Sequence, residues 1–161
     1  MHAARDYAAI ALKDAPRDRS PLMRAAADVL WNALAPTGVS WVGFYLKDAT
    51  SDTMVLGPCR DKPACSPIGL HGACGQSWRN EQSLVVHDVR LLGDGYIACD
   101  PRDLSEVVVP LFGADGACWG VLDADSFEVS AFSERDAQEL ALLMVRIGLS
   151  DRTPAHATRV V

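Results

Sequence analysis

The stretch that decides the fold reads SEVVVPLFGADGACWGVLDADS and covers residues 105–126. It contains two runs rich in β-branched and other apolar residues, SEVVVPLF and ACWGVLDADS. The residues GADG between them are typical of a hairpin turn. The sequence therefore predicts two adjacent antiparallel strands, and the largely apolar second strand is expected near the centre of the sheet.

Three acidic residues interrupt the apolar pattern of this hairpin. Because side chains alternate across a strand, Asp123 and Asp125 should share a face with Trp119 and Val121. Two registers are open, in which Glu106 lies opposite either Asp123 or Asp125. Either register places all three carboxylates on one face of the sheet.

Clustered carboxylates give that face a specific chemistry. Like charges across a strand pair are destabilising and raise one another's pKa, so one of them can hold a proton near neutral pH. Such a group can act as a general acid, and the cluster can also bind an ammonium group. The alternatives are a solvated face or a site for a hard cation, although the sequence has no calcium-loop pattern.

The other elements follow outward from the hairpin. Helices are predicted over about residues 3–13, from Ser20 and Pro21 to about residue 34, near Cys74, and after Ser133, which with Asp136 forms a capping box. Further strands are predicted at about 39–47, 53–58 and 84–86, and a long loop at about 87–103. This pattern predicts an α+β domain around a central antiparallel sheet of five or six strands. A single domain is expected over residues 1–149, and residues 150–161 form a flexible tail.

Composition limits the classes of function. The chain has 161 residues, a net charge of −6, 49% hydrophobic and 22% charged residues, as in an ordinary globular domain. The acidic balance and the lack of a basic cluster argue against a nucleic-acid partner. No apolar run is long enough to span a membrane, and charges interrupt the N-terminal segment, so no signal peptide is expected. We therefore expect a cytoplasmic protein.

Five cysteines are present, an odd number that argues against a disulfide scaffold: Cys59, Cys65, Cys74, Cys99 and Cys118. No CxxC pair occurs, so a structural zinc site is not expected. Cys65 and Cys99 lie in predicted loops, and Cys74 lies at a predicted helix N-terminus, where the helix dipole favours a thiolate. Three such thiols are typical of a redox set, in which one attacks and another resolves. Cys118 is expected on the strand face away from the acids, and Cys59 is given no role.

The strand SWVGFYL, residues 40–46, is rich in aromatic residues. Trp41, Gly43 and Tyr45 should lie on one face, where two rings flanking a glycine would leave a slot for a small apolar group or a cation. Ordinary core packing is the alternative.

These motifs together resemble a known family. WVGFYL, LGPC, KPAC, GACG, IACD, SEVVVPL and GVLDADS occur in the same order as in the free methionine-(R)-sulfoxide reductases, which are small stand-alone GAF-domain proteins. The resemblance covers about residues 20–149. It implies a GAF-like fold, with the N- and C-terminal helices on one face of the sheet and loops forming a pocket on the other.

The resemblance also implies roles for the cysteines. Cys99 in IACD matches the nucleophile, Cys65 in KPAC matches the thiol that resolves it as a disulfide, and Cys74 in GACG matches a third redox cysteine with a secondary resolving role. One departure affects the resolving thiol: eight residues separate Cys65 from Cys74 where the family usually has nine, and Gly69 replaces a proline. Cys59 therefore remains a rival resolving thiol.

The pocket residues are implied in the same way. Glu106, Asp123 and Asp125 match the acids that line the substrate pocket, with Glu106 and Asp125 also taking part in catalysis, and Trp41 and Tyr45 match the aromatics around the sulfoxide methyl group. The implied reaction reduces free methionine-(R)-S-oxide through a sulfenic acid and a disulfide, with thioredoxin as the external reductant. The resemblance implies no bound cofactor or metal. It also implies that the protein forms a homodimer. The rivals are a GAF sensor of a small ligand and a redox sensor without turnover.

Overall fold

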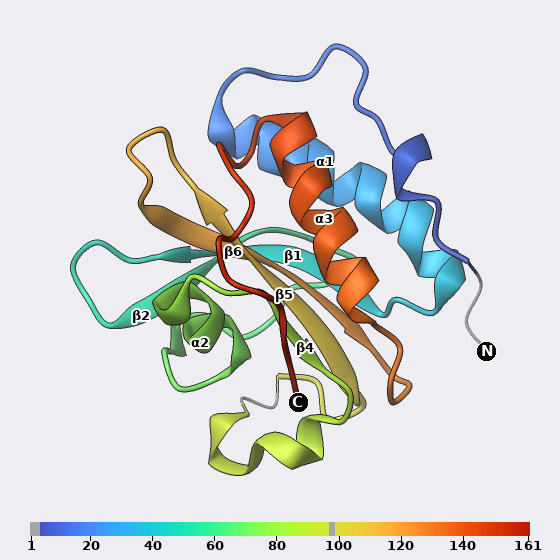
Figure 1. The fold of residues 1–161 in the computed structure, drawn as a ribbon, viewed down its shortest axis with the longest axis vertical. Coiled ribbons are helices and arrows are strands. Elements are labelled where there is room, and N and C mark those ends of the chain that lie inside the picture. The colour runs from blue at the N-terminus through green and yellow to red at the C-terminus, as the bar shows by residue number, and fades with distance from the viewer. Residues whose placement is uncertain (1–3, 97–98) are drawn as a thin grey trace.

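The computed structural model describes residues 4–96 and 99–161. Within them the chain forms a sheet flanked by helices (Figure 1). The helices are η1 (Tyr7–Ala9), α1 (Arg19–Leu34), η2 (Ala35–Thr37), α2 (Ala73–Asn80), η3 (Val89–Gly95) and α3 (Glu134–Ile147). The strands are β1 (Trp41–Lys47), β2 (Thr53–Arg60), β3 (Ile68–Gly69), β4 (Leu84–Val86), β5 (Ser105–Phe112), β6 (Cys118–Ser126) and β7 (Arg159–Val160). The predicted α+β class is confirmed.

The described strands form a seven-stranded sheet in the order β3-β2-β1-β6-β5-β4-β7. All neighbours are antiparallel except β4 and β7, which are parallel. The sheet is thus mixed and larger than the five or six strands expected. The two additional strands, β3 and β7, have two residues each, which is too short for an alternating pattern to be visible in the sequence.

The two faces of the sheet have separate cores. α1 and α3 lie together on one face (Figure 1), where residues such as Leu30, Phe44 and Leu140 are fully buried. The other face packs against α2 and the loops, and its core includes Trp41, Tyr45 and other residues. Helices on one face and loops on the other match the expected GAF-like arrangement.

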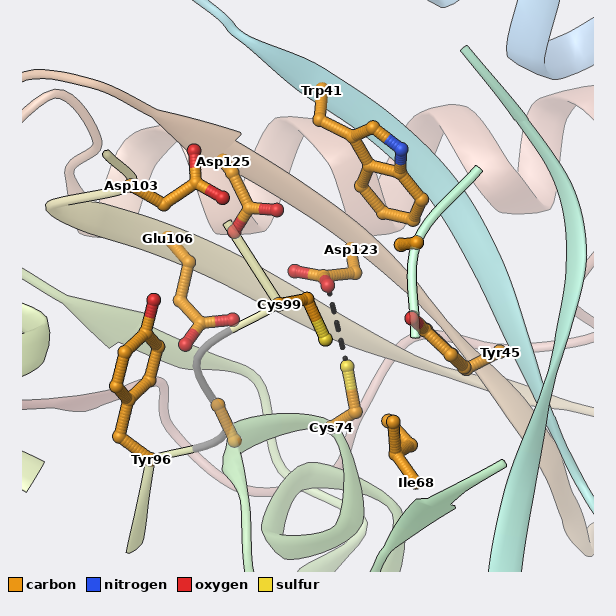
Figure 2. A pocket seen from close by; sticks show the side chains of 12 residues that line it. Trp41, Tyr45, Ile68, Cys74, Tyr96, Cys99, Asp103, Glu106, Asp123 and Asp125 are labelled. Carbon is orange, nitrogen blue, oxygen red and sulfur yellow. Dashed lines mark hydrogen bonds between the residues drawn. The ribbon is translucent and has the colours of Figure 1, made fainter. Parts of the chain in front are cut away.

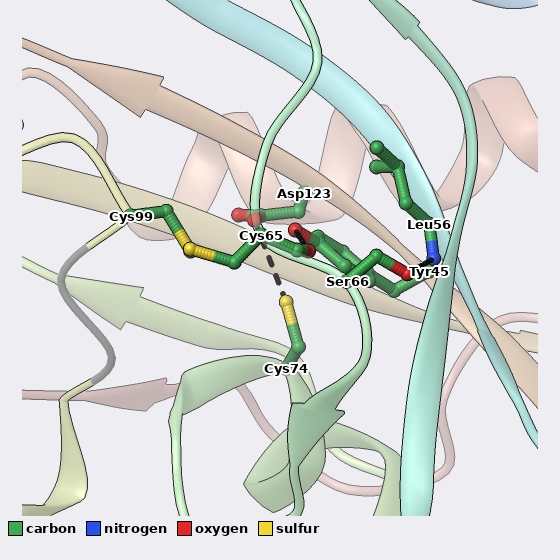
Figure 3. The surroundings of a disulfide bond; sticks show 7 residues. All are labelled: Tyr45, Leu56, Cys65, Ser66, Cys74, Cys99 and Asp123. Carbon is green, nitrogen blue, oxygen red and sulfur yellow. Dashed lines mark hydrogen bonds between the residues drawn. A yellow bond between two sulfur atoms is a disulfide. The ribbon is translucent and has the colours of Figure 1, made fainter.

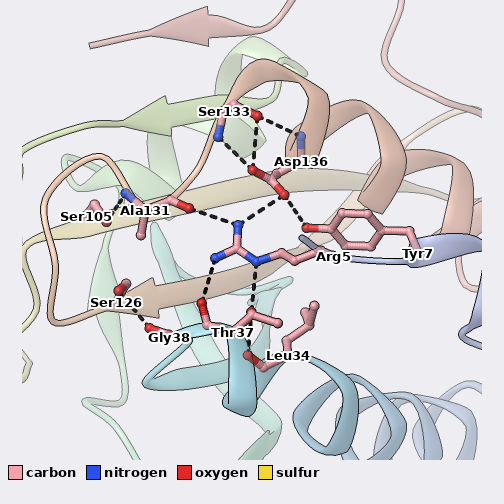
Figure 4. Close-up of polar contacts among 10 residues, drawn as sticks. All are labelled: Arg5, Tyr7, Leu34, Thr37, Gly38, Ser105, Ser126, Ala131, Ser133 and Asp136. Atoms are coloured by element: carbon pink, nitrogen blue, oxygen red, sulfur yellow. Dashed lines mark hydrogen bonds and ion pairs between the residues drawn. The ribbon is translucent and has the colours of Figure 1, made fainter. Parts of the chain in front are cut away.

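The N-terminal helix predicted over residues 3–13 is wrong. The structure has a single 3-10 turn at η1, in which the carboxylate of Asp6 accepts from the amide of Ala9. Tertiary contacts explain the difference (Figure 4). Arg5 forms an ion pair with Asp136 of α3 at 3.1 Å, and Tyr7 donates to the same carboxylate at 2.6 Å. Arg5 and Tyr7 are two positions apart and reach the same carboxylate. A regular helix would point side chains at that spacing in different directions.

The central hairpin settles the register that the sequence left open. Glu106 pairs with Asp125, and Val108 pairs with Asp123. A register shift near the turn pairs Phe112 with Cys118, so the alternation of β6 is reversed at its start. Trp119 consequently packs on the α1 face beneath Arg19. The prediction that Trp119 shares a face with the acids is wrong for this reason.

The C-terminal segment lies along the edge of the sheet. The amide of Val161 donates to Val85, and the amide of His87 donates to Val161. The flexibility expected for residues 150–161 stays a prediction. None of the helices in the described part of the chain has the length and apolar character that crossing a membrane requires.

Candidate active site

The three predicted carboxylates converge on the α2 side of the sheet (Figure 2). Glu106 comes from β5, and Asp123 and Asp125 come from β6. One oxygen of each lies within 4.8 Å of the others. Glu106 and Asp123 are buried, at 5% and 6% exposed, and Asp125 is partly buried. The Oδ1 atom of Asp123 is buried without a hydrogen-bond partner among the described residues, so it is available to a ligand in the pocket.

Burial and mutual repulsion raise the pKa of these carboxyl groups. Desolvation, together with the charge of Asp125, raises the pKa of Glu106 to about 8. Burial and the neighbouring acids raise the pKa of Asp123 and Asp125 well above the usual range as well. The cluster can therefore hold protons at neutral pH, which is what a general acid needs. The same three oxygens are spaced closely enough to hold a cation.

Cys74 lies beside this cluster, close to the start of α2. Its Sγ donates to Oδ2 of Asp123 at 3.4 Å, and the side chain is buried. Burial, with the charges of Asp123 and Glu106, raises the pKa of the Cys74 thiol well above its usual value. Cys74 lies in the first turn of α2, as expected, but burial and the neighbouring acids oppose the thiolate that the helix dipole favours.

The two loop cysteines meet at the mouth of the pocket. A disulfide joins Cys65 and Cys99, whose Cα atoms are 5.5 Å apart (Figure 3). Cys99 is exposed and Cys65 is partly buried, whereas Cys59, Cys74 and Cys118 are free thiols. Cys99 also lines the acidic pocket. Residues 97 and 98 of the IACD motif lie outside the described residues.

The aromatic strand supplies one wall. The rings of Trp41 and Tyr45 lie 6.1 Å apart at 37°, and both residues line the pocket. The slot predicted above Gly43 is filled by the indole itself. A Cβ added at Gly43 would lie 2.5 Å from Cη2 of Trp41. The glycine therefore lets the tryptophan fold over its own strand.

Asp103 is a pocket residue that the sequence did not reveal. It is 8% exposed, accepts a hydrogen bond from Oγ of Ser40 at 3.0 Å, and lines the pocket beside Asp125. Burial raises its pKa to about 6, and the charge of Asp100 adds to this. Tyr96 also lines the pocket. Both residues come from the irregular segment before β5, where no periodicity indicates the direction of a side chain.

The pocket above the acids is small in this disulfide-bonded form. Its volume is about 50 Å³, which is room for a few waters rather than an amino acid. A wider hollow of about 350 Å³ adjoins it and shares Cys99, Asp103 and Asp125. Lys62 and Arg102 line this outer hollow and both pair with Asp100. The site is thus an acidic floor under a disulfide, with cationic side chains at its rim.

Comparison with known proteins agrees with this geometry. The family model described as "GAF domain" matches residues 16–149. The free methionine-R-sulfoxide reductase of Saccharomyces cerevisiae is 35% identical over 129 residues, which are 78% of this chain and 71% of the relative. This chain belongs to that reductase family within the GAF domains.

Two further relatives support the assignment to the reductase family. The free methionine-R-sulfoxide reductase of Escherichia coli is 40% identical over 113 residues, covering 69% of this chain and 66% of the relative. The X-ray structure of the reductase from Neisseria meningitidis in complex with its substrate superposes with a TM-score of 0.73 at 44% identity, covering 81% of this chain and 75% of that one.

Proposed function

We propose that this protein reduces free methionine-(R)-S-oxide to methionine, using Cys99 as the nucleophile and Cys65 as the resolving thiol. One observation carries the proposal: a Cys65–Cys99 disulfide lies directly over a pocket with a floor of three protonatable carboxyl groups. The family relatives whose names state this activity support it.

The first step reduces the sulfoxide and oxidises Cys99. The Cys99 thiolate attacks the sulfoxide sulfur while a carboxyl group of the cluster gives a proton to the sulfoxide oxygen. The attack forms a bond between the Cys99 sulfur and the substrate sulfur, and the protonated oxygen takes up a second proton and leaves as water. Water then attacks the Cys99 sulfur and breaks this S–S bond, so that Cys99 becomes a sulfenic acid, a proton returns to the carboxylate and methionine is released as the thioether. Glu106 and Asp125 are the acids assigned to this proton transfer. The raised pKa of Glu106 supports the role, because its carboxyl group still holds a proton at neutral pH.

The second step closes the disulfide. The Cys65 thiol attacks the sulfenic sulfur of Cys99, the S–S bond forms, and the oxygen leaves as water. Cys74 takes a secondary resolving role because its thiol is buried and hydrogen-bonded to Asp123. Cys59 is a weaker candidate for the resolving role, because it is a free thiol whose Sγ contacts the carbonyl of Lys62 at 3.4 Å.

An external dithiol then reduces the disulfide, and thioredoxin is the proposed reductant. The exposure of Cys99 supports this step, because an incoming thiolate must reach one of the two sulfurs. No bound cofactor or metal is required for the cycle. A homodimer is proposed only from the family resemblance.

Substrate selection is proposed to rest on the acids and aromatics. A bound ammonium group lowers the pKa of a neighbouring acid, so one carboxyl group of the cluster can ionise and pair with the ammonium group of a free amino acid. Methionine within a polypeptide has no such group. Trp41 and Tyr45 are the residues proposed to enclose the methyl group of the sulfoxide, and the position of both rings in the pocket wall supports this role. A site that pairs a charged group in this way rejects analogues that lack it.

The decisive assay couples NADPH, thioredoxin reductase and thioredoxin to the purified protein with free methionine-(R)-S-oxide. Steady NADPH consumption is expected, with no consumption for Cys99→Ser and little for N-acetylmethionine sulfoxide. Reversible disulfide formation without release of methionine would instead identify a redox sensor. Activity retained in Cys99→Ser would reject the assignment of the nucleophile.

A further inference from the structure

Both aromatic residues of the pocket direct their polar ends at the segment that carries Cys65. We call residues 61–67 the Cys65 segment. Trp41 donates from Nε1 to the carbonyl of Lys62 at 2.7 Å. Tyr45 donates from its hydroxyl to the carbonyl of Cys65 at 2.8 Å, as Figure 3 shows. Each ring therefore lines the pocket, while its polar atom donates a hydrogen bond to the Cys65 segment.

Other anchors of the Cys65 segment are few. Within residues 4–96 and 99–161, the segment makes no backbone–backbone hydrogen bond outside the pairing of β1 with β2. The partly buried Cys59 thiol also donates to the Lys62 carbonyl, at 3.4 Å. Ser66 accepts from the amide of Leu56 at 3.0 Å, and Lys62 pairs with Asp100 through a side chain that is 42% exposed. Trp41 and Tyr45 are each 3% exposed, so they are the buried donors that fix the path of the segment. Solvent competes least with hydrogen bonds of that kind.

The position of this segment controls how fast a disulfide can close. Condensation requires the Cys65 sulfur to lie within reach of the Cys99 sulfur. A mobile segment would hold the Cys65 sulfur in that position for only a small fraction of the time. A hydrogen bond of ordinary strength changes such an equilibrium by roughly fivefold. Burial raises the pKa of Tyr45 far beyond physiological pH, so its hydroxyl remains a donor throughout.

We propose that Tyr45, together with Trp41, is a positioning residue for the disulfide-forming step, because it holds the Cys65 carbonyl and so the resolving thiol opposite Cys99. This role is separate from the proposed contact with the substrate methyl group. It depends on the proposed function only in that methionine sulfoxide is then the natural oxidant of Cys99. Hydrogen peroxide can replace that oxidant. It converts the Cys99 thiol to a sulfenic acid with release of water, and Cys65 then forms the disulfide with release of a second water.

The test uses Tyr45→Phe, which keeps the ring and removes only the donor. The reduced protein is oxidised with one equivalent of hydrogen peroxide, and the Cys99 sulfenic acid is trapped with dimedone while disulfide formation is followed by mass spectrometry. The trapped fraction is expected to rise, corresponding to closure slowed roughly 3- to 10-fold. In glutathione redox buffers, the equilibrium constant for the Cys65–Cys99 disulfide is expected to fall by a similar factor.

Tyr7→Phe is the matched control. Tyr7 is also buried, at 4% exposed, and its hydroxyl donates to Asp136 at 2.6 Å on the opposite face of the sheet. Both closure and the glutathione equilibrium should be unchanged in this variant. Trp41→Phe provides a second variant should Tyr45→Phe fail to fold, and it should move both measurements in the same direction as Tyr45→Phe.

Two outcomes overturn the proposal. In one, the rate of disulfide closure and the glutathione equilibrium constant of Tyr45→Phe equal those of the unmodified protein. The other is an equal change in Tyr7→Phe, which would point to a general loss of stability. Failure of the proposed function is distinguishable, because the unmodified protein would then close its disulfide with peroxide and yet release no methionine from the sulfoxide.

Discussion

Glu106 carries an energetic cost that depends on pH. In the folded protein its pKa is raised to about 8, against an ordinary value of 4.5. Between these values the unfolded chain gives up the proton and the folded chain keeps it. Unfolding therefore becomes easier as pH rises from about 4.5 to about 8, and the stabilisation present below that window is lost above it.

Replacing Glu106 by glutamine should remove this dependence while keeping the shape of the side chain. The free energy of unfolding of the unmodified protein should fall between pH 5 and pH 8.5, and that of Glu106→Gln should fall less, by on the order of 2–4 kcal/mol. Urea denaturation at the two pH values measures the difference. Parallel pH profiles would mean that Glu106 is ionised at neutral pH and unsuited to donate a proton. Turnover should also drop sharply in Glu106→Gln.

Single residues mark where prediction from the sequence succeeds and where it stops. Alternation along the strands correctly predicts that Glu106, Asp123 and Asp125 share a face, because the side-chain direction in a strand is fixed by the backbone. The protonation state of the Cys74 thiol cannot be predicted in the same way. Its pKa depends on burial against acids that are more than 30 residues away in the chain. The inward direction of Asp103 depends on Ser40, also far away in sequence.

At the scale of elements, β1 depends on a glycine. Gly43 pairs with Cys59 of β2, and the Trp41 indole covers it. An added Cβ would lie 2.5 Å from the Trp41 ring and 2.6 Å from the Cys59 Cβ. The indole must give way, and its hydrogen bond to Lys62 would be lost with it. The Cys59 Cβ moves only with its backbone, so β1 and β2 must also separate slightly at this pair.

We therefore expect Gly43→Ala to destabilise the protein by about 1–3 kcal/mol. Denaturant unfolding followed by tryptophan fluorescence measures both the stability and the displaced indole. Gly113→Ala is the control, because in the exposed hairpin turn its Cβ would meet an Asp115 carboxylate oxygen at 3.0 Å and otherwise only atoms of Arg19 and Ala117 at 3.8 and 3.9 Å. Its effect should stay within about 0.5 kcal/mol. Equal effects at the two positions would contradict the packing argument.

Most of the main helices and strands were predicted correctly. β5 and β4 match their predicted bounds, and the capping box of α3 is present with Ser133 and Asp136. The failures are local. The register shift beside Trp119 adds a residue to one strand, and the N-terminal turn follows contacts of Arg5, neither of which alternation can reveal. The family resemblance, rather than periodicity, indicated which loop cysteines would pair.

At the scale of the molecule, the sheet separates a structural face from a chemical one. Arg5 belongs to the structural face and ties the N-terminal segment to η2 and α3 (Figure 4). It donates to the Thr37 hydroxyl and the Ala131 carbonyl, both at 2.9 Å, and its side chain is 5% exposed in the ion pair with Asp136. The site contacts lie on the other face.

Arg5→Ala should thus lower stability without altering the disulfide. Removing one partner of a buried ion pair leaves Asp136 uncompensated, so a loss of about 3–5 kcal/mol is expected in urea denaturation. Arg90→Ala is the comparison, because its ion pair with Asp88 lies at the surface and should contribute little to stability. Slower closure of the Cys65–Cys99 disulfide in folded Arg5→Ala would show that the two faces are coupled.

The disulfide links the stability of the whole chain to its redox state. Cys65 and Cys99 are separated by 34 positions, so closing the bond restricts the unfolded chain and should stabilise the oxidised protein by about 3–4 kcal/mol relative to the reduced protein. The same linkage makes the folded disulfide harder to reduce than the unfolded one, so the external dithiol must be a stronger reductant than an unfolded peptide would need. Urea denaturation of the oxidised and reduced forms measures the difference, and Cys65→Ser should abolish it. Equal stabilities would mean that the native fold resists bringing the two loops together, and resolution by Cys65 would then work against the structure rather than with it.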